Sequence, residues 1–326
     1  MLSKNNRRHG VFAVEQRFDE ITLQSTNNKR DVLAIADALK IVFKQMEIGG
    51  SRPRTIQSYE YVFNDFIKRT GLRYVDEIDA NSIYDYLNEL QVANTTKLLR
   101  LKSVKAVLSR FFDNRWIEYK FWRTIQIKID KKVKKGASEN DIEILLSLID
   151  KSTFIGFRDT VAIMLMYKTG IRIRTLGELR ERHVDFDKLV LDMDGAILKN
   201  HEFLKLPIDE QMAGLFQTLI ELNKKIRKQY KQQNDFIFIT QNGLGINASD
   251  RSNNAISKQL TKYSRTYGFK NINAHSIRRA YAKNLLEKGA NVALISKALG
   301  HASLETTTQY LDLSKEEVAQ SLRDYL

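Results

Sequence analysis

The sequence contains no cysteine among its 326 residues. This absence excludes disulfide bonds, thiolate catalysis and zinc sites that depend on cysteine. Only two residues are proline, so little interrupts regular secondary structure. No apolar run approaches the ~20 residues of a membrane-spanning helix, and the polar, basic first ten residues lack the apolar core of a secretion signal. We therefore expect a cytoplasmic protein with no membrane segment.

Acidic residues are also in deficit. The chain has 39 Asp and Glu against 53 Lys and Arg, a formal net charge of +14. Many proteins of other kinds are basic, so the net charge alone only raises the chance of a polyanionic partner such as nucleic acid. The excess is concentrated in residues 92–135, which hold thirteen basic and three acidic side chains with aromatic residues between them. Such a block is either a solvated face or a surface that contacts phosphate, and the concentration favours phosphate contact.

The side chains that contact DNA are predicted from this block. Four lie on the polar face of a helix expected to begin at Asn94, and four lie in the basic segment KKVKKG. The predicted DNA-binding residues are Arg100, Lys102, Lys105, Arg110, Lys131, Lys132, Lys134 and Lys135. A charged linker repels itself unless an anion lies beneath it, and duplex DNA between two domains would supply that anion. An ordinary flexible hinge is the alternative interpretation.

Hydrophobic periodicity predicts two folded domains. The predicted parts are an N-terminal leader or arm at 1–30, a helical DNA-binding domain at 31–130, a basic linker at 131–137 and a second domain at 138–326. Apolar residues at helical spacing place four helices in the first domain, at about 31–46, 53–70, 79–90 and 94–112.

The second domain changes its hydrophobic period along the chain. Helices are expected at Arg158–Lys168 and Arg174–Leu179, followed by short strands at 184–186, 189–191 and 203–208. After Pro207 the pattern is helical again. The expected fold is therefore mainly α with a small antiparallel β-sheet, an α+β arrangement.

Four local patterns in the second domain carry candidate chemistry. They are an arginine after a glycine at a helix end, a lysine near a hairpin tip, a His-x-x-Arg at a helix start, and a Leu-Gly-His followed nine residues later by tyrosine. The residues concerned are Arg172, Lys199, His275, Arg278, His301 and Tyr310. Each alone has an ordinary explanation: a solvated cation, a polar helix start, or a tyrosine packed in the core.

Together these side chains suit transesterification at a DNA phosphate. The reaction needs a nucleophilic hydroxyl, positive charge on the non-bridging oxygens, and an acid for the leaving 5′-oxygen. Arginines donate bidentate hydrogen bonds and stay protonated, a lysine supplies a proton, and histidines hydrogen-bond the phosphate or move a proton. No metal or cofactor is required, and the sequence has no acidic cluster at metal-ligand spacing.

The segments 169–187 (TGIRIRTLGELRERHVDFD) and 275–311 (HSIRRAYAKNLLEKGANVALISKALGHASLETTTQYL) resemble the two sequence boxes of tyrosine recombinases, the phage integrases. Members of that family share Arg, Lys, His-x-x-Arg, His and Tyr in this order, and the basic first half is similar to their core-binding domain. The resemblance implies a C-shaped clamp of two domains around duplex DNA. It also implies that Tyr310 forms a 3′-phosphotyrosine while Lys199 protonates the leaving oxygen, in an integrase of a phage or mobile element.

The sequence departs from the family pattern at three places. Thr175 stands where a glutamate is usual, with Glu178 one turn further on; Lys199 lacks its usual flanking glycines; and Arg279 replaces a common histidine or lysine. These departures keep open an alternative function, a DNA-binding repressor or regulator of a prophage that has lost recombination activity. Under both functions the partner is duplex DNA with specific sites. Ser314 followed by Glu317 predicts a last helix, through which the resemblance implies self-association on DNA.

Overall fold

The computed structural model describes residues 32–129, 135–198, 203–248, 254–301 and 304–311, and for Thr306, Gln309 and Tyr310 it describes only the backbone. The chain divides into two compact units, Met1–Lys131 and Lys132–Leu326. Each unit has a hydrophobic core of its own.

The regular elements in the described residues of the N-terminal unit are helices, apart from an isolated β-bridge between Ala34 and Tyr74. Its elements are α2 (Ile35–Ile48), α3 (Pro53–Thr70), η1 (Val75–Glu77), α4 (Ala80–Glu89), α5 (Asn94–Asp113) and η2 (Phe121–Thr124). The sequence itself sets several ends. Pro53 occupies the first turn of α3, where no backbone N–H is needed, and Gly71 ends that helix at φ +72°. The Asp79 carboxylate caps α4 by accepting from the backbone N–H of Ser82 at 2.8 Å. The four predicted helices are confirmed, although α2 begins four residues later than expected.

Apolar residues at helical spacing form the core of this unit. Along α5, Val104, Val107 and Phe111 have no exposed surface. Phe63 of α3 lies edge-to-face with Phe66 at 5.3 Å and with Phe111 at 5.6 Å between ring centres. Such aromatic pairs contribute ~0.5–1.5 kcal/mol beyond their buried area. They fix α5 against α3 and leave the polar face of α5 directed away from the core.

The C-terminal unit combines helices with a small sheet. Its elements are α6 (Glu139–Leu148), α7 (Phe154–Thr169), α8 (Ile173–Gly177), η3 (Glu181–His183), β1 (Val184–Asp185), β2 (Val190–Met193), β3 (Leu204–Pro207), α9 (Glu210–Tyr230), α10 (Ala255–Tyr267), α11 (Ala274–Glu287), α12 (Val292–Ala298) and α13 (Leu304–Leu311). Two expected bounds were wrong. Helix α7 begins at Phe154 because the Thr153 hydroxyl caps it, accepting from the N–H of Gly156 at 3.1 Å. Helix α8 spans Ile173–Gly177 instead of 174–179.

The three strands form one antiparallel sheet in the order β1-β2-β3. Leu191 pairs with Leu206 and Asp192 with Lys205, so one face is buried and the other carries an ion pair of 2.8 Å between Asp192 and Lys205. The predicted sheet is confirmed. Strands β1 and β3 are shorter than expected, whereas β2 runs on to Met193. Strand β2 begins one residue later than expected because Leu189 has φ +52° and lies in the turn before it.

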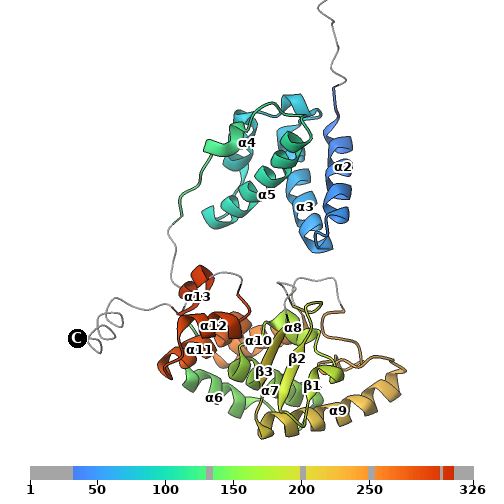
Figure 1. Ribbon diagram of the computed structural model, residues 1–326, viewed down its shortest axis with the longest axis vertical. Coiled ribbons are helices and arrows are strands. Elements are labelled where there is room, and N and C mark those ends of the chain that lie inside the picture. The colour runs from blue at the N-terminus through green and yellow to red at the C-terminus, as the bar shows by residue number, and fades with distance from the viewer. Residues whose placement is uncertain (1–31, 130–134, 199–202, 249–253, 302–303, 312–326) are drawn as a thin grey trace, which may run out of the picture. The chain divides into compact units, whose positions relative to one another are not determined.

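Helix α7 is the centre of the C-terminal unit. It packs against α9, α10 and α11, and ten of its sixteen residues are buried. Figure 1 shows α11, α12 and α13 gathered on one side of this unit, with the sheet and α9 on the other. At the C-terminal end of α7, Gly170 lies against Tyr281 of α11 and against Leu299, both distant in the sequence.

No helix in the described part of the chain combines the length and the apolar character that crossing a membrane requires.

Candidate active site

The first predicted site arginine, Arg172, follows a forced turn at the end of α7. Gly170 ends α7 at φ +62°, and a Cβ at this position would lie 2.3 Å from the ring of Tyr281. Only glycine fits both the left-handed backbone and the contact with the ring. Arg172 follows this turn and is the N-cap of α8. Nη2 of Arg172 donates to the carbonyl of Gly300 at 2.7 Å.

The second predicted arginine, Arg278, projects from the second turn of α11. The Asn273 side chain caps this helix by accepting from the N–H groups of His275 and Ser276. Arg278 is 3% exposed, and its guanidinium donates to the carbonyls of Gly170 and Leu299. His275 lies one turn earlier on the same helix and is exposed.

His301 completes this cluster. Its backbone N–H donates to the carbonyl of Ser296 at 3.0 Å, and Gly300 before it has φ +57°. Its Nε2 lies 3.2 Å from Nη2 of Arg278, and its Nδ1 lies 2.9 Å from the hydroxyl of Thr307. Because a guanidinium only donates, Nε2 accepts, and the ring proton therefore resides on Nδ1, which donates to Thr307.

Three of the six predicted site side chains thus converge on one short segment. Arg172 binds the carbonyl of Gly300, and Arg278 binds that of Leu299 and the ring of His301. We call Arg172, Arg278 and His301 the arginine site. It holds two guanidinium groups and an imidazole side by side, which is the charge arrangement that an anionic phosphate needs.

For two other predicted site residues, Tyr310 and Lys199, the structure does not describe the side chain. Tyr310 lies in α13, three residues after Thr307, and its side chain is outside the description. Lys199 also lies outside the described residues. Before it, Leu198 is buried, and the carbonyl of Ile197 accepts from the Thr175 hydroxyl at 3.4 Å.

Sequence reasoning missed Thr307, which is fully buried and holds Nδ1 of His301. The run Thr306 to Thr308 gave no signal as to which hydroxyl would face a histidine six residues earlier. Glu178, considered as a replacement for the usual family glutamate, instead accepts a hydrogen bond from the Asn247 amide at 2.8 Å.

The basic residues predicted to face DNA differ in their surroundings. Arg100 forms an ion pair with Asp65 and lies 3.3 Å from the hydroxyl of Tyr86. Lys105 donates to the carbonyl of Ile125, and burial lowers its pKa. Both side chains therefore form contacts within the N-terminal unit that stabilise it.

Other basic residues predicted to contact DNA are more exposed. Lys102 and Lys135 are exposed, and Arg110 is partly exposed. Lys131, Lys132 and Lys134 lie outside the described residues.

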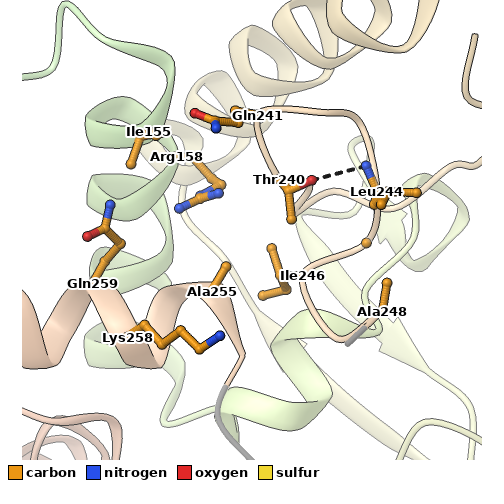
Figure 2. Close-up of a pocket in the computed structure, with 11 residues that line it drawn as sticks. Ile155, Arg158, Thr240, Gln241, Leu244, Ile246, Ala248, Ala255, Lys258 and Gln259 are labelled. Carbon is orange, nitrogen blue, oxygen red and sulfur yellow. Dashed lines mark hydrogen bonds between the residues drawn. The ribbon is translucent and has the colours of Figure 1, made fainter. Parts of the chain in front are cut away.

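A pocket of about 480 Å³ lies elsewhere in the C-terminal unit (Figure 2). Figure 2 shows Ile155 and Arg158 of α7 facing Ala255 and Lys258 of α10 across it. Arg158 lies twelve residues before Gly170, about 18 Å along α7 at the helical rise of 1.5 Å per residue. Its guanidinium is bound to Asp159 and to the carbonyl of Ile239. The pocket is therefore separate from the arginine site.

The chain is similar to known recombinases and integrases. A family model described as the phage integrase family matches residues 137–317. The chain is 23% identical over 284 residues to the tyrosine recombinase XerA of Pyrococcus furiosus, which covers 85% of this chain and 90% of that relative. It is 26% identical over 278 residues to the tyrosine recombinase XerC of Bacillus pumilus, which covers 82% of this chain and 88% of that relative.

The fold is also similar to the folds of solved integrase structures. The Tn1549 transposon integrase in complex with a circular intermediate DNA has a TM-score of 0.70 at 20% identity and covers 89% of this chain and 99% of its own. A lambda integrase dimer bound to a COC′ core site has a TM-score of 0.66 at 16% identity, covering 89% and 81%. Because the family model spans more than half of the sequence, this chain belongs to the phage integrase family, the tyrosine recombinases.

Proposed function

We propose that this chain is a site-specific DNA strand transferase that cuts and rejoins duplex DNA through Tyr310. The observation that carries the proposal is the arginine site, in which Arg172 and Arg278 bind the neighbouring carbonyls of Gly300 and Leu299 and Arg278 also contacts the ring of His301. Two guanidinium groups that are buried or half-buried contribute nothing to hydrophobic packing. Their planar donors match the two non-bridging oxygens of a DNA phosphate.

The proposed cleavage step is one displacement at phosphorus. The phenolic oxygen of Tyr310 attacks, a bond from tyrosine to phosphorus forms, and the bond from phosphorus to the 5′-oxygen breaks. The phenolic proton passes to an imidazole of the site, and Lys199 donates a proton to the leaving 5′-oxygen. Arg172, Arg278, His275 and His301 stabilise the charge that grows on the phosphate. Rejoining reverses the step with a 5′-hydroxyl from another strand.

The proposed partner is duplex DNA, contacted by both units. Phosphate contacts would come from exposed cations, among them Lys102 of α5 in the N-terminal unit and Lys135 in the C-terminal unit. The similar Tn1549 integrase is described in complex with DNA, and the lambda integrase as a dimer on a core site, which supports DNA binding and self-association here. Family membership does not favour the repressor alternative.

A suicide substrate tests this proposal. Genomic fragments selected by the purified chain are nicked near the bound centre, so that the cleaved strand cannot be religated, and covalent protein–DNA adducts are measured. Tyr310→Phe should abolish adducts and leave binding intact, because it removes only the attacking oxygen. Tyr267→Phe is the matched control, since among the described residues that hydroxyl donates to the carbonyl of Leu148 at 3.3 Å and to none of the arginine-site residues.

Adducts that persist in Tyr310→Phe would contradict the assignment of the nucleophile. Tight, specific binding by the wild-type chain without any adduct, in the presence of host-cell extract, would overturn the strand-transferase proposal and favour the regulator.

A further inference from the structure

Helix α8, which begins at Arg172, is too short to hold its own position. It spans Ile173–Gly177, five residues, and its N-cap makes no side-chain capping bond. Isolated helices of this length are unstable, and the last four carbonyls of any helix have no partner within it. The orientation of α8, and with it the direction of the Arg172 side chain, must therefore come from contacts with the rest of the unit.

Two asparagines supply those contacts from outside the helix. The Asn254 amide donates to the carbonyl of Ile173 at 3.2 Å, and the Asn247 amide donates to that of Arg174 at 3.0 Å. The two amides also bind each other, Asn254 Nδ2 donating to Asn247 Oδ1 at 3.1 Å. The residues on either side of them, among them Ile246 and Ala255, line the pocket of Figure 2.

The amide of Asn247 lies directly against the helix. A Cβ on Gly177 would meet its Nδ2 and Oδ1 at 2.5 Å, so glycine is needed here for the close approach of the amide. Asn247 also donates to Glu178, the residue that ends α8, at 2.8 Å. Asn254 is in addition the N-cap of α10, where its Oδ1 accepts from the N–H of Ser257 at 2.9 Å. The pair thus joins α8 to the first turn of α10.

Thr175 of α8 makes a further contact, toward the hairpin. Its buried hydroxyl donates to the carbonyl of Ile197 at 3.4 Å, two residues before Lys199. The family's usual glutamate is missing at this position. Helix α8 is consequently held by the Asn247–Asn254 pair and by the hairpin contact of Thr175.

We infer that Asn247 and Asn254 are positioning residues for Arg172, which set its guanidinium against the Gly300 carbonyl and so against the phosphate. The inference rests on the proposed function. A displacement of about 1 Å at a reacting centre lowers the rate by ~100-fold. Loss of either amide should slow cleavage by about 10- to 100-fold without a matching loss of DNA binding.

Two variants remove the amide donors while keeping most of the fold. Asn247→Asp has the same shape but cannot donate to the carbonyl of Arg174 or to Glu178. Asn254→Ser keeps an oxygen that caps α10 and loses the amide. Asn234→Asp is the matched control, because that partly buried asparagine also donates to a backbone carbonyl, of Gly243 at 2.8 Å, but makes no hydrogen bond to α8 among the described contacts.

The test compares single-turnover adduct formation on two suicide substrates, one with the natural scissile phosphate and one with a methylphosphonate. The neutral methylphosphonate depends less on a guanidinium, so a defect that acts through Arg172 should be several-fold smaller on it. Binding constants and unfolding temperatures are measured in parallel. We expect slow cleavage of the phosphate, partial recovery on the methylphosphonate, and wild-type behaviour in Asn234→Asp.

Wild-type rates in both variants, or equal losses on the two substrates, would overturn the inference. Amide hydrogen exchange over residues 172–178 gives a readout that does not depend on cleavage, and it should accelerate in both variants but not in the control. Unchanged exchange beside an active wild-type chain refutes the positioning role alone. A wild-type chain that forms no adduct refutes the proposed function and with it the positioning role.

Discussion

Gly170→Ala should strongly destabilise the C-terminal unit. Gly170 has φ +62°, and its missing Cβ leaves room for the ring of Tyr281 and a methyl group of Leu299. An added methyl would lie 2.3 Å and 2.8 Å from two ring carbons and 3.0 Å from the leucine. The ring cannot bend away as a flexible chain could. The backbone carbonyl of Gly170 would also shift, and this carbonyl holds Arg278.

The expected loss of stability has two contributions, backbone strain and overpacking. A left-handed backbone costs a residue with a Cβ about 1–2 kcal/mol, and overpacking a well-packed site costs typically ~1–3 kcal/mol. Together they predict a loss of about 2–5 kcal/mol in the free energy of unfolding. For a unit of this size, 1 kcal/mol corresponds to ~2–4 °C. The unfolding transition of the C-terminal unit should therefore move down by roughly 5–15 °C.

Thermal and urea unfolding followed by circular dichroism measure this effect. Gly214→Ala is the control, because Gly214 lies within α9 and an added Cβ there meets nothing within 4 Å. That change should stabilise the protein by ~0.5–1 kcal/mol, the opposite sign for the same substitution. A Gly170→Ala protein within about 0.5 kcal/mol of wild type, the usual range for an exposed site, would refute the packing described for the arginine site.

Two further predictions concern pH and salt. Burial, together with the charge of Arg182, lowers the pKa of His183, whose Nδ1 accepts from the N–H of Arg180 at 3.0 Å. As the pH falls below about 6.5 the unfolded chain binds a proton there before the folded chain does, so stability decreases toward pH 5. His183→Asn should flatten this decrease in thermal melts, and equal slopes would contradict the explanation. Lys102→Gln should reduce the slope of log K for DNA against log salt by about 0.9. Arg100→Gln should mainly lower the unfolding temperature. If binding titrations instead show a reduced slope for Arg100→Gln and an unchanged slope for Lys102→Gln, Arg100 is the phosphate contact.

The fold could be predicted where its determinants are local. Asp79 and Asn291 cap the helices that follow them, and Pro53 and Gly71 bracket α3, because capping depends on residues within a few positions. The predicted start of α7, at Arg158, was wrong by four residues. Its apolar pattern is blurred because the helix is buried on nearly all sides.

The sequence predicted a set of candidate residues for the site but not their arrangement. The order of Arg172, His275, Arg278, His301 and Tyr310 is legible in the sequence. The contact between Arg172 and the carbonyl of Gly300 spans 128 residues, and no local signal indicates it. Thr307 and the pair Asn247–Asn254 were missed for the same reason, because a polar side chain that serves a distant backbone carbonyl resembles any surface residue in the sequence.

Charge was the least reliable guide at the level of single residues. The basic block pointed to α5, yet Arg100 binds Asp65, 35 residues away, with the ring of Tyr61 6.0 Å from its guanidinium carbon. A cation bound in this way must break an internal ion pair before it can neutralise a phosphate, and the Asp65 carboxylate would then keep only its contacts with Arg69 and Tyr86 among the described residues. The thirteen basic residues of 92–135 are therefore an upper limit on the number of cations with which this segment contacts phosphates. The exposed Lys102 is a better candidate for contact than its more buried neighbours.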